Sequence, residues 1–315
     1  MRTIDWADDA IVIIDQTALP GEERLLRLTA VDDLIAAIRS LAVRGAPALG
    51  VAGALGVALA VRTDAAHRIT DIETARPTAV NLARGARRAA AVLAEGPDAV
   101  LAEALAVRDE EIAASAAMAA RGADLIAELC GARPRMLTHC NTGALAAVTG
   151  GTALGVVLEM HRRGALGDVI ASETRPLLQG ARLTAWELDR AGVSHAIAVD
   201  SAVPGLIARG EVHAVVTGLD RVAANGDVVN KVGTYPLALA ARAADIPFVA
   251  AGPSSSVDHA TPTGRDIEIE ERDAAEVRGA WSMPGTPIRN PAFDVTPAEL
   301  VWALVTEAGV TRLPR

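Results

Sequence analysis

The hydrophobic pattern of the first 132 residues is mainly helical. A short apolar run at residues 10–15 predicts a β-strand, and Ala- and Leu-rich segments with polar residues at helical spacing follow it. Helices are predicted over residues 32–43, 47–62, 79–95 and 97–129. Glycine and proline residues between positions 130 and 135 end this pattern. We therefore expect a mostly helical N-terminal domain at residues 1–132, with a small β element.

From residue 133 onward, short apolar runs alternate with helical segments. Five runs predict β-strands at residues 135–140, 168–173, 195–200, 213–220 and 247–252. Helices are expected at residues 143–163, 177–192, 204–210 and 235–245, and a loop at residues 221–231. This alternation is typical of an α/β fold with a parallel, doubly wound sheet, which we expect to occupy a second domain at residues 133–315.

The C-terminal tail carries the signals of one more helix. Thr296 and Glu299 have the spacing of a capping box, and Pro297 suits the first helical position. Gly309 suits a helix end. We therefore expect a final helix between residues 297 and 309.

The composition favours a folded protein with a large apolar core. Hydrophobic residues make up 51% of the 315 residues and charged residues 22%, so disorder is not expected. The formal net charge of −9 argues against nucleic-acid binding, which needs a basic surface. A small anionic substrate stays open, because local Arg and Lys groups decide such binding.

Neither secretion nor membrane insertion is expected. The first residues carry acids where a signal peptide would have basic residues. The longest apolar run, residues 46–61, is shorter than the roughly 20 residues that span a bilayer, and its glycines suit a closely packed buried helix. The two cysteines, Cys130 and Cys140, form no visible disulfide framework, so we expect a reducing, cytoplasmic setting.

Four potentially reactive side chains lie at the ends of successive predicted strands: Cys140, Glu173, Asp200 and Asp220. Open α/β sheets bind ligands beyond the carboxyl ends of their strands, so we expect a site there. Taken alone, each of the three acids could equally cap the helix that follows it.

Cys140 is the first candidate for a reactive group. A helix that begins at Thr142 or Gly143 would place the thiol at a helix N-terminus, where exposed amides and the dipole stabilise a thiolate. Neighbours on a strand point to opposite faces, so we interpret His139 as a buried core histidine rather than the base of Cys140. Cys130 is interpreted as a core residue.

Asp220 is the second candidate. The apolar run before it should dehydrate its carboxyl group and favour the protonated form, which suits a general acid. Asn225 and Gly226 predict a tight turn after it. Asn230 and Lys231 then precede a helix, where they could hold sugar hydroxyls or a phosphate. For Lys231, a solvated loop lysine is the alternative.

The N-terminal domain offers a third candidate, a small anion site. Pro47 fits the first turn of a helix, so the amides of Gly45 and Ala46 can point outward beside Arg44. A simple Gly-Pro turn is the alternative, and Arg88 has the pattern of a surface arginine.

No GxGxxG motif, Walker A loop or Cys/His metal cluster is present. The residues alone indicate an isomerase or transferase that acts on a small phosphorylated molecule.

Five segments of the chain resemble those of a known enzyme family, the methylthioribose-1-phosphate isomerases. This branch belongs with ribose-1,5-bisphosphate isomerases and with regulatory subunits of the guanine-nucleotide exchange factor of eukaryotic translation initiation. The resemblance runs nearly end to end, and five long motifs in order are a specific signal. The segments are RGAPALG, HCNTGALA, ETRPLLQGARLTAWEL, DRVAANGDVVNKVGTY and NPAFDVTPAEL.

The resemblance implies a Rossmann-like domain after the helical one, usually in a homodimer. It implies the aldose–ketose isomerisation of 5-methylthio-α-D-ribose 1-phosphate to 5-methylthio-D-ribulose 1-phosphate in methionine salvage, without an organic cofactor. By motif position it implies catalytic roles for Cys140 and Asp220. The substrate-binding roles fall on Arg44, Gly45, Ala46, Arg88, Gln179, Asn230 and Lys231.

Three departures from the family pattern leave the substrate open. Ser172 stands in place of an acid, Leu219 in place of an alanine, and Arg84 in place of a tryptophan. Each could alter the pocket around the 5-position of the sugar. An isomerase of 5-deoxyribose 1-phosphate or of another 5-substituted pentose 1-phosphate is therefore one alternative. A non-catalytic regulatory or scaffold subunit is another, although such subunits are not expected to keep both Cys140 and Asp220.

Overall fold

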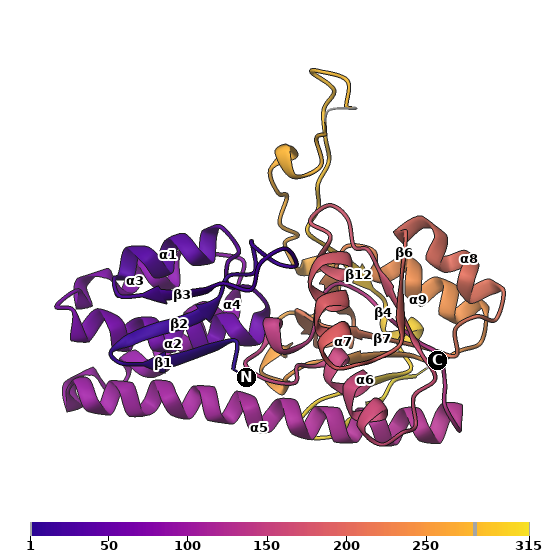
Figure 1. The fold of residues 1–315 in the computed structure, drawn as a ribbon, viewed down its shortest axis with the longest axis horizontal. Helices are drawn as coiled ribbons and strands as arrows, with labels where there is room; N and C mark the ends of the chain where they lie inside the picture. The colour runs from indigo at the N-terminus through magenta and orange to yellow at the C-terminus, as the bar shows by residue number, and fades with distance from the viewer. Residues whose placement is uncertain (1, 280–281, 315) are drawn as a thin grey trace. The chain divides into compact units, whose positions relative to one another are not determined.

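The computed structural model describes residues 2–279 and 282–314, which form two compact units (Figure 1). The first unit consists of Met1–Ala117 and Thr142–Gly151. The second consists of Met118–Asn141 and Thr152–Arg315. The chain therefore leaves the second unit after Asn141, contributes the short segment Thr142–Gly151 to the first unit, and re-enters the second unit at Thr152. The division into two domains at residues 132 and 133 stays a prediction.

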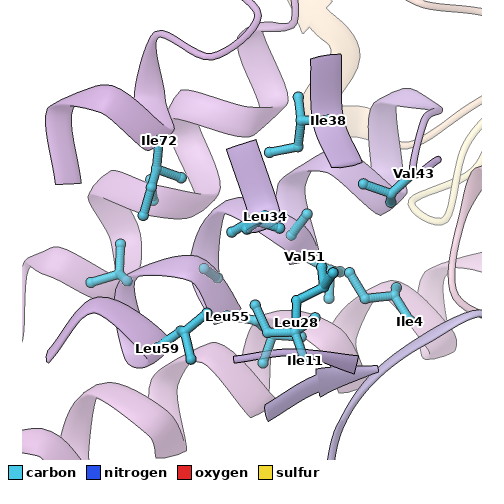
Figure 2. Packing of buried hydrophobic residues seen from close by; sticks show 14 of the residues in the cluster. Ile4, Ile11, Leu28, Leu34, Ile38, Val43, Val51, Leu55, Leu59 and Ile72 are labelled. Atoms are coloured by element: carbon cyan, nitrogen blue, oxygen red, sulfur yellow. The ribbon is translucent and has the colours of Figure 1, made fainter. Parts of the chain in front are cut away.

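The first unit contains a small antiparallel sheet and a set of helices, as the pattern predicts. The sheet has the order β1-β2-β3, with strands Ile4–Ala7, Ala10–Ile14 and Leu25–Leu28. The helices are α1 (Val31–Arg39), α2 (Ala46–Arg62), α3 (Ile69–Glu73), α4 (Val80–Ala90) and the first part of α5 (Pro97–Cys130). Figure 2 shows the core that they enclose, built from aliphatic side chains of the sheet, α1, α2 and α3.

The glycines of α2 and α4 let the two helices approach closely. A Cβ atom added to Gly85 of α4 would lie 1.9 Å from the carbonyl oxygen of Gly50 in α2. Only glycine fits there, because the two backbones are in contact. This contact explains the expected close packing of the apolar run at residues 46–61, which is buried as α2.

The second unit is built on a seven-stranded sheet with the order β14-β13-β10-β7-β4-β5-β6. Six strands are parallel, and β14 (Val310–Arg312) pairs antiparallel with β13. The parallel strands are β4 (Met136–Thr138), β5 (Val169–Ser172), β6 (His195–Ala198), β7 (Ala214–Gly218), β10 (Phe248–Ala251) and β13 (Ala303–Val305). The main helices are α6 (Ala153–Arg162), α7 (Ala185–Arg190), α8 (Val203–Ala208) and α9 (Thr234–Ala243). The expected α/β class and parallel sheet are confirmed.

The strand order reverses between β4 and β7. From β4 the chain proceeds outward through β5 to β6, and from β7 it proceeds in the opposite direction through β10 to β13. The two central strands are adjacent and parallel. In open α/β sheets the crevice beyond such a switch point is where ligands bind.

A second, four-stranded sheet follows β7, with the order β11-β8-β9-β12. Its strands are Val257–Asp258, Arg221–Ala223, Val228–Lys231 and Phe293–Thr296. The expectation of a plain loop at residues 221–231 was wrong, because Val222, Val228 and Val229 are buried in a β-hairpin. The predicted tight turn is confirmed at its tip, where Gly226 has φ 89°.

The expected C-terminal helix is absent from the described part of the chain. After β12 the residues Ala298–Leu300 form only one 3-10 turn, and the chain continues into β13 and β14. The run Val301–Val305 carries apolar residues that suit a buried parallel strand as well as a helix. In the structure, residues Ala303–Val305 of this run pair with β10 and therefore form a strand rather than a helix.

The segment after Cys140 also differs from its prediction. No continuous helix runs from residue 143, because α6 begins only at Ala153 and one 3-10 turn, Ala144–Ala146, precedes it. Gly151, with φ 95°, folds back so closely that an added Cβ would lie 2.3 Å from the carbonyl oxygen of Thr142. The ends of the segment therefore meet and break the helical pattern. The expected placement of the Cys140 thiol at the N-terminus of this helix was wrong.

The close approach of α2 and α4 generates a stability prediction. We expect Gly85→Ala to lower the free energy of unfolding by about 1–3 kcal/mol, because the added methyl group cannot fit against Gly50. Gly50→Ala is the matched control, since its Cβ would make only an ordinary 3.5 Å contact with Asn81. Thermal unfolding followed by circular dichroism measures both variants. Equal melting temperatures would contradict the backbone contact.

Candidate active site

Cys140 lies at the carboxyl end of β4 in an unusual backbone conformation. Its φ of 62° is left-handed, which is uncommon for a residue with a side chain. Its N–H donates to Thr174 Oγ1 (2.9 Å), and its carbonyl oxygen accepts from Thr184 Oγ1 (2.6 Å). The residue is only 8% exposed. Backbone conformations of this kind cluster at functional sites, so the structure supports Cys140 as a candidate reactive group.

His139 is buried with a partner at each ring nitrogen. Nδ1 contacts Ser172 Oγ at 2.6 Å, and Nε2 contacts the carbonyl oxygen of Val232 at 2.9 Å. Since a carbonyl can only accept, Nε2 donates, and the Nδ1 of a neutral ring accepts from the Ser172 hydroxyl. Desolvation lowers the pKa of His139, which favours the neutral ring. The interpretation of His139 as a buried core histidine is confirmed.

Asp200 caps the turn that follows β5. Its carboxylate accepts the N–H groups of Thr174 (2.8 Å) and Arg175 (2.6 Å). The capping alternative for strand-end acids had Asp200 bind the helix that follows it, but these bonds go instead to the turn after the neighbouring strand β5. They also fix Thr174, the residue that binds the backbone of Cys140, so Asp200 supports the cysteine indirectly.

Asp220 lies at the carboxyl end of β7, on the strand next to that of Cys140. Residues Leu137 and Thr138 of β4 pair with Val215 and Val216 of β7, so the two chain ends emerge from neighbouring strands. The N–H of Asp220 donates to the carbonyl oxygen of Val229 (2.9 Å), and the residue is half-buried. The structure thus brings Cys140 and Asp220 to the same switch point.

Leu219, the bulky neighbour of Asp220, packs into the core. It is 6% exposed, and a Cβ added to Gly252 would lie 2.6 Å from two of its atoms. The glycine at the end of β10 therefore leaves room for the larger side chain. The departure from alanine at this position is accommodated by packing.

Gln179 lies between β5 and α7, and it is buried with 4% of its surface exposed. Among the described residues its Oε1 atom has no hydrogen-bond partner. Buried polar groups in folded proteins are nearly always paired, so an unpaired acceptor is expected where a ligand binds.

Asn230 and Lys231 end the strand β9. Asn230 Nδ2 donates to Thr234 Oγ1 (2.9 Å), and Lys231 Nζ donates to the carbonyl oxygen of Ala292 (2.9 Å). The ammonium group also lies 5.0 Å from the centre of the Phe293 ring, a cation–π contact. Both residues are buried, so the alternative of a solvated loop lysine was wrong for Lys231.

The first unit holds the remaining predicted residues. Helix α2 begins at Ala46, with Pro47 in its first turn and Gly45 (φ 95°) before it. A Cβ added to Gly45 would lie 2.4 Å from the carbonyl oxygen of Ala146, so this turn packs on the segment Thr142–Gly151. Arg44 is buried beside it, and the chain of that segment follows directly from Asn141.

Arg88 lies on the exposed face of α4, where two carboxylates hold it. Its Nε donates to Glu103 (2.6 Å) and its Nη2 to Glu110 (2.7 Å). These ion pairs raise the pKa of the guanidinium above its usual value. Its role in substrate binding stays a prediction.

Several residues around the site were not singled out from the sequence. Thr174 and Thr184 hold Cys140, Glu187 accepts from Asn141 Nδ2 (2.7 Å), and Asp294 holds the turn after Lys231. Thr174, Thr184 and Glu187 lie in the ETRPLLQGARLTAWEL segment, and Asp294 lies in NPAFDVTPAEL. Their positions within the family-like segments were the only available signal.

Two absences hold for the described ranges 2–279 and 282–314. Their His, Cys, Asp and Glu side chains form no group of three or more that could hold a metal ion. None of the helices in these ranges combines the length and the apolar character needed to cross a membrane.

Comparison with curated proteins gives relatives that match nearly the whole of this chain. The methylthioribose-1-phosphate isomerase of Anaeromyxobacter sp. (strain K) is 53% identical, over 98% of this chain and 93% of its own length. The probable bifunctional methylthioribose-1-phosphate isomerase/methylthioribulose-1-phosphate dehydratase of Nocardia farcinica (strain IFM 10152) is 51% identical over 98% of this chain. The chain spans 60% of the length of that bifunctional relative.

Solved structures give the same fold under two names. The 5-methylthioribose 1-phosphate isomerase from Pyrococcus horikoshii OT3 superposes with a TM-score of 0.90 and 37% identity, over 99% of this chain and 92% of that one. The translation initiation factor eIF-2B subunit delta from A. fulgidus superposes with a TM-score of 0.89 and 38% identity, over 100% and 96%.

A family model also matches most of this chain. It describes the Initiation factor 2 subunit family, and it matches residues 42–312. Together with relatives of about half-identical sequence over nearly the whole chain, this match establishes that the chain belongs to the Initiation factor 2 subunit family.

Proposed function

We propose that the protein is an aldose–ketose isomerase that converts 5-methylthio-α-D-ribose 1-phosphate to 5-methylthio-D-ribulose 1-phosphate in methionine salvage. The observation that carries the proposal is the pair Cys140 and Asp220, at the ends of the adjacent strands β4 and β7. A thiol and a carboxyl group at a switch point suit proton chemistry on a small ligand. The names of relatives of about 50% identity agree with it.

The substrate-binding residues follow from their chemistry. Gln179, with its unpaired Oε1, and Asn230 suit sugar hydroxyls, and the Lys231 ammonium suits a negatively charged phosphate. The N–H groups of Gly45 and Ala46 at the start of α2, with Arg44, are proposed as further anion donors. Arg88 is proposed for the same role, which requires it to exchange at least one glutamate partner for the substrate.

The reaction meets a particular chemical obstacle. Phosphate on the anomeric oxygen blocks the spontaneous ring opening of ordinary aldoses, so the enzyme must break the bond between C1 and the ring oxygen. We propose that protonated Asp220 gives its proton to the ring oxygen and later regains one from the C2 hydroxyl. The hydrogen on C2 moves to C1, and C2 becomes the ketone. Cys140 stabilises the charge that develops during this transfer.

A cytoplasmic homodimer is the proposed setting. Ile197, on the edge strand β6, and Val199, which follows it, are 48% and 56% exposed, and apolar side chains on a sheet edge favour association. We expect sedimentation equilibrium to give twice the mass of the chain. We further expect Ile197→Glu to shift the protein toward monomer, whereas Leu93→Glu, at a site 38% exposed on the first unit, leaves the dimer intact. A monomeric unmodified protein would contradict the proposal.

A panel of three substrates tests the proposed function. Purified protein is assayed against methylthioribose 1-phosphate, 5-deoxyribose 1-phosphate and ribose 1,5-bisphosphate, with the ketose detected by NMR. We expect the fastest turnover with methylthioribose 1-phosphate. Preference for 5-deoxyribose 1-phosphate would favour the alternative isomerase. No conversion of any of the three would favour a non-catalytic regulatory or scaffold subunit.

Substitutions of the proposed catalytic pair give a second test. Cys140→Ser and Asp220→Asn are each expected to lower kcat at least about 100-fold with the fold intact, because each removes a group that takes part in the transition state. Cys130→Ser is the matched control. Its thiol is half-buried at the end of α5, and burial raises the pKa of Cys130 to about 11, so its loss should leave kcat unchanged. Near-normal turnover in Asp220→Asn would refute the role of the acid.

A further inference from the structure

Asp294 is a half-buried carboxylate beside the proposed substrate-binding pair of β9. Strands β12 and β9 pair antiparallel, with Asp294 opposite Asn230 and Phe293 opposite Lys231. Residues directly opposite each other in such a pair project from the same face of the sheet. The side chains of Asp294 and Asn230 are therefore neighbours.

Asp294 and Asn230 both bind the turn that precedes α9. The Asp294 carboxylate accepts the N–H of Gly233 (2.7 Å) and of Tyr235 (3.1 Å). Between them, the Thr234 hydroxyl accepts from Asn230 Nδ2 (2.9 Å) and donates to the carbonyl oxygen of Lys231 (2.7 Å). The amide nitrogen only donates, so Oδ1 is the atom of Asn230 that can accept from a sugar hydroxyl.

The same turn also contacts the strand end that carries Cys140. The carbonyl oxygen of Val232 accepts from His139 Nε2 (2.9 Å). The His139 ring lies so close to Gly233 that an added Cβ would be 2.8 Å from Cε1. Since His139 precedes Cys140, a shift of the turn would displace both the substrate-binding pair and the end of β4.

The charge of Asp294 is costly where it lies. Burial raises its pKa from 3.8 to about 6, while the amides of the turn and the charge of Lys231 act in the opposite direction. Other titratable groups on elements packed against β12 are Tyr235 and Arg242 of α9, and Arg265 and Asp266 of the 3-10 turn Gly264–Asp266. A carboxylate that is ionised at neutral pH despite this burial lowers stability. The hydrogen bonds to the N–H groups of Gly233 and Tyr235 are the structural reason for a carboxylate at this position.

We propose that Asp294 is a positioning residue, whose carboxylate holds the turn Val232–Tyr235 and so fixes Asn230 and Lys231 for the substrate. The inference rests on the proposed isomerase function. It assigns Asp294 to substrate binding through Asn230 and Lys231, and it assigns no contact between Asp294 and the substrate.

The substitution Asp294→Asn tests the proposal. The amide keeps the size of the side chain, removes the charge and leaves one acceptor oxygen for two N–H groups. We expect KM for methylthioribose 1-phosphate to rise about tenfold while kcat changes less than about threefold, because binding is affected more than chemistry. Asp266→Asn is the matched control. This exposed carboxylate accepts the N–H of Thr263 (3.0 Å), and its removal should leave KM unchanged.

The pH dependence of KM separates positioning from a merely structural role. In the unmodified enzyme KM should rise as the pH falls through about 6, because protonation removes the charge that holds the turn. In Asp294→Asn this component should be absent. Any dependence that comes from the substrate phosphate stays the same in both proteins, so the difference between them belongs to Asp294.

Thermal unfolding provides a readout that needs no activity. A carboxyl group whose pKa is raised in the folded state stabilises the fold below the pKa of the unfolded chain, 3.8, and this contribution is lost as the pH rises through about 6. The melting temperature of Asp294→Asn relative to the unmodified protein should therefore increase between about pH 4.5 and about pH 7.

The outcomes separate the two proposals. An active unmodified enzyme with an unchanged KM in Asp294→Asn would overturn the role of Asp294 and leave the isomerase function standing. A fall in kcat as large as the rise in KM would also contradict a role confined to positioning the binding pair. An unmodified protein that converts none of the three pentose phosphates would overturn the function, and the positioning role with it.

Discussion

The parallel pairing of β4 with β7 is the constraint on which the site depends. Because consecutive strands run outward in opposite directions from this pair, the connections that follow β4 and β7 diverge there, and such a switch point is where open α/β sheets bind ligands. Cys140 and Asp220, 80 positions apart in the chain (220 − 140 = 80), emerge there from neighbouring strands. The hairpin that follows Asp220 returns Asn230 and Lys231 to the same region, since Asp220 N–H binds Val229 of that hairpin.

Side-chain hydrogen bonds hold the irregular backbone around this pair. Thr174 and Thr184 bind the left-handed Cys140, and Asp200 in turn binds the amide of Thr174. His139 connects the ends of β4 and β5 with the turn before α9. Buried polar groups are paired almost everywhere in proteins, and these bonds satisfy the polar groups of the chain ends, while the Oε1 of Gln179 is left unpaired among the described residues.

Much of the fold could be predicted from the sequence, because alternating apolar runs and helical segments report the layers of an α/β unit. The same pattern placed Cys140 and Asp220 at strand ends. It failed where distant packing overrides local periodicity: the hairpin at residues 221–231, the strands in place of a C-terminal helix, and the broken helix after Cys140. Asp294 carries no local signal, since its importance arises only when β12 pairs with β9.

The segment Thr142–Gly151 belongs to the first unit although the chain on both sides of it belongs to the second. This limits how the two units can be separated or recombined, by evolution or by engineering. The backbone passes from one unit to the other near residues 117, 141 and 151, and Val148 is fully buried in the core of the first unit. Thr3 binds the carbonyl oxygens of this segment as well. A gene fragment for residues 118–315, which hold the seven-stranded sheet, would therefore carry the segment Thr142–Gly151 without the core in which Val148 is buried. The two halves do not form interchangeable modules, and recombination between relatives is expected to preserve them together.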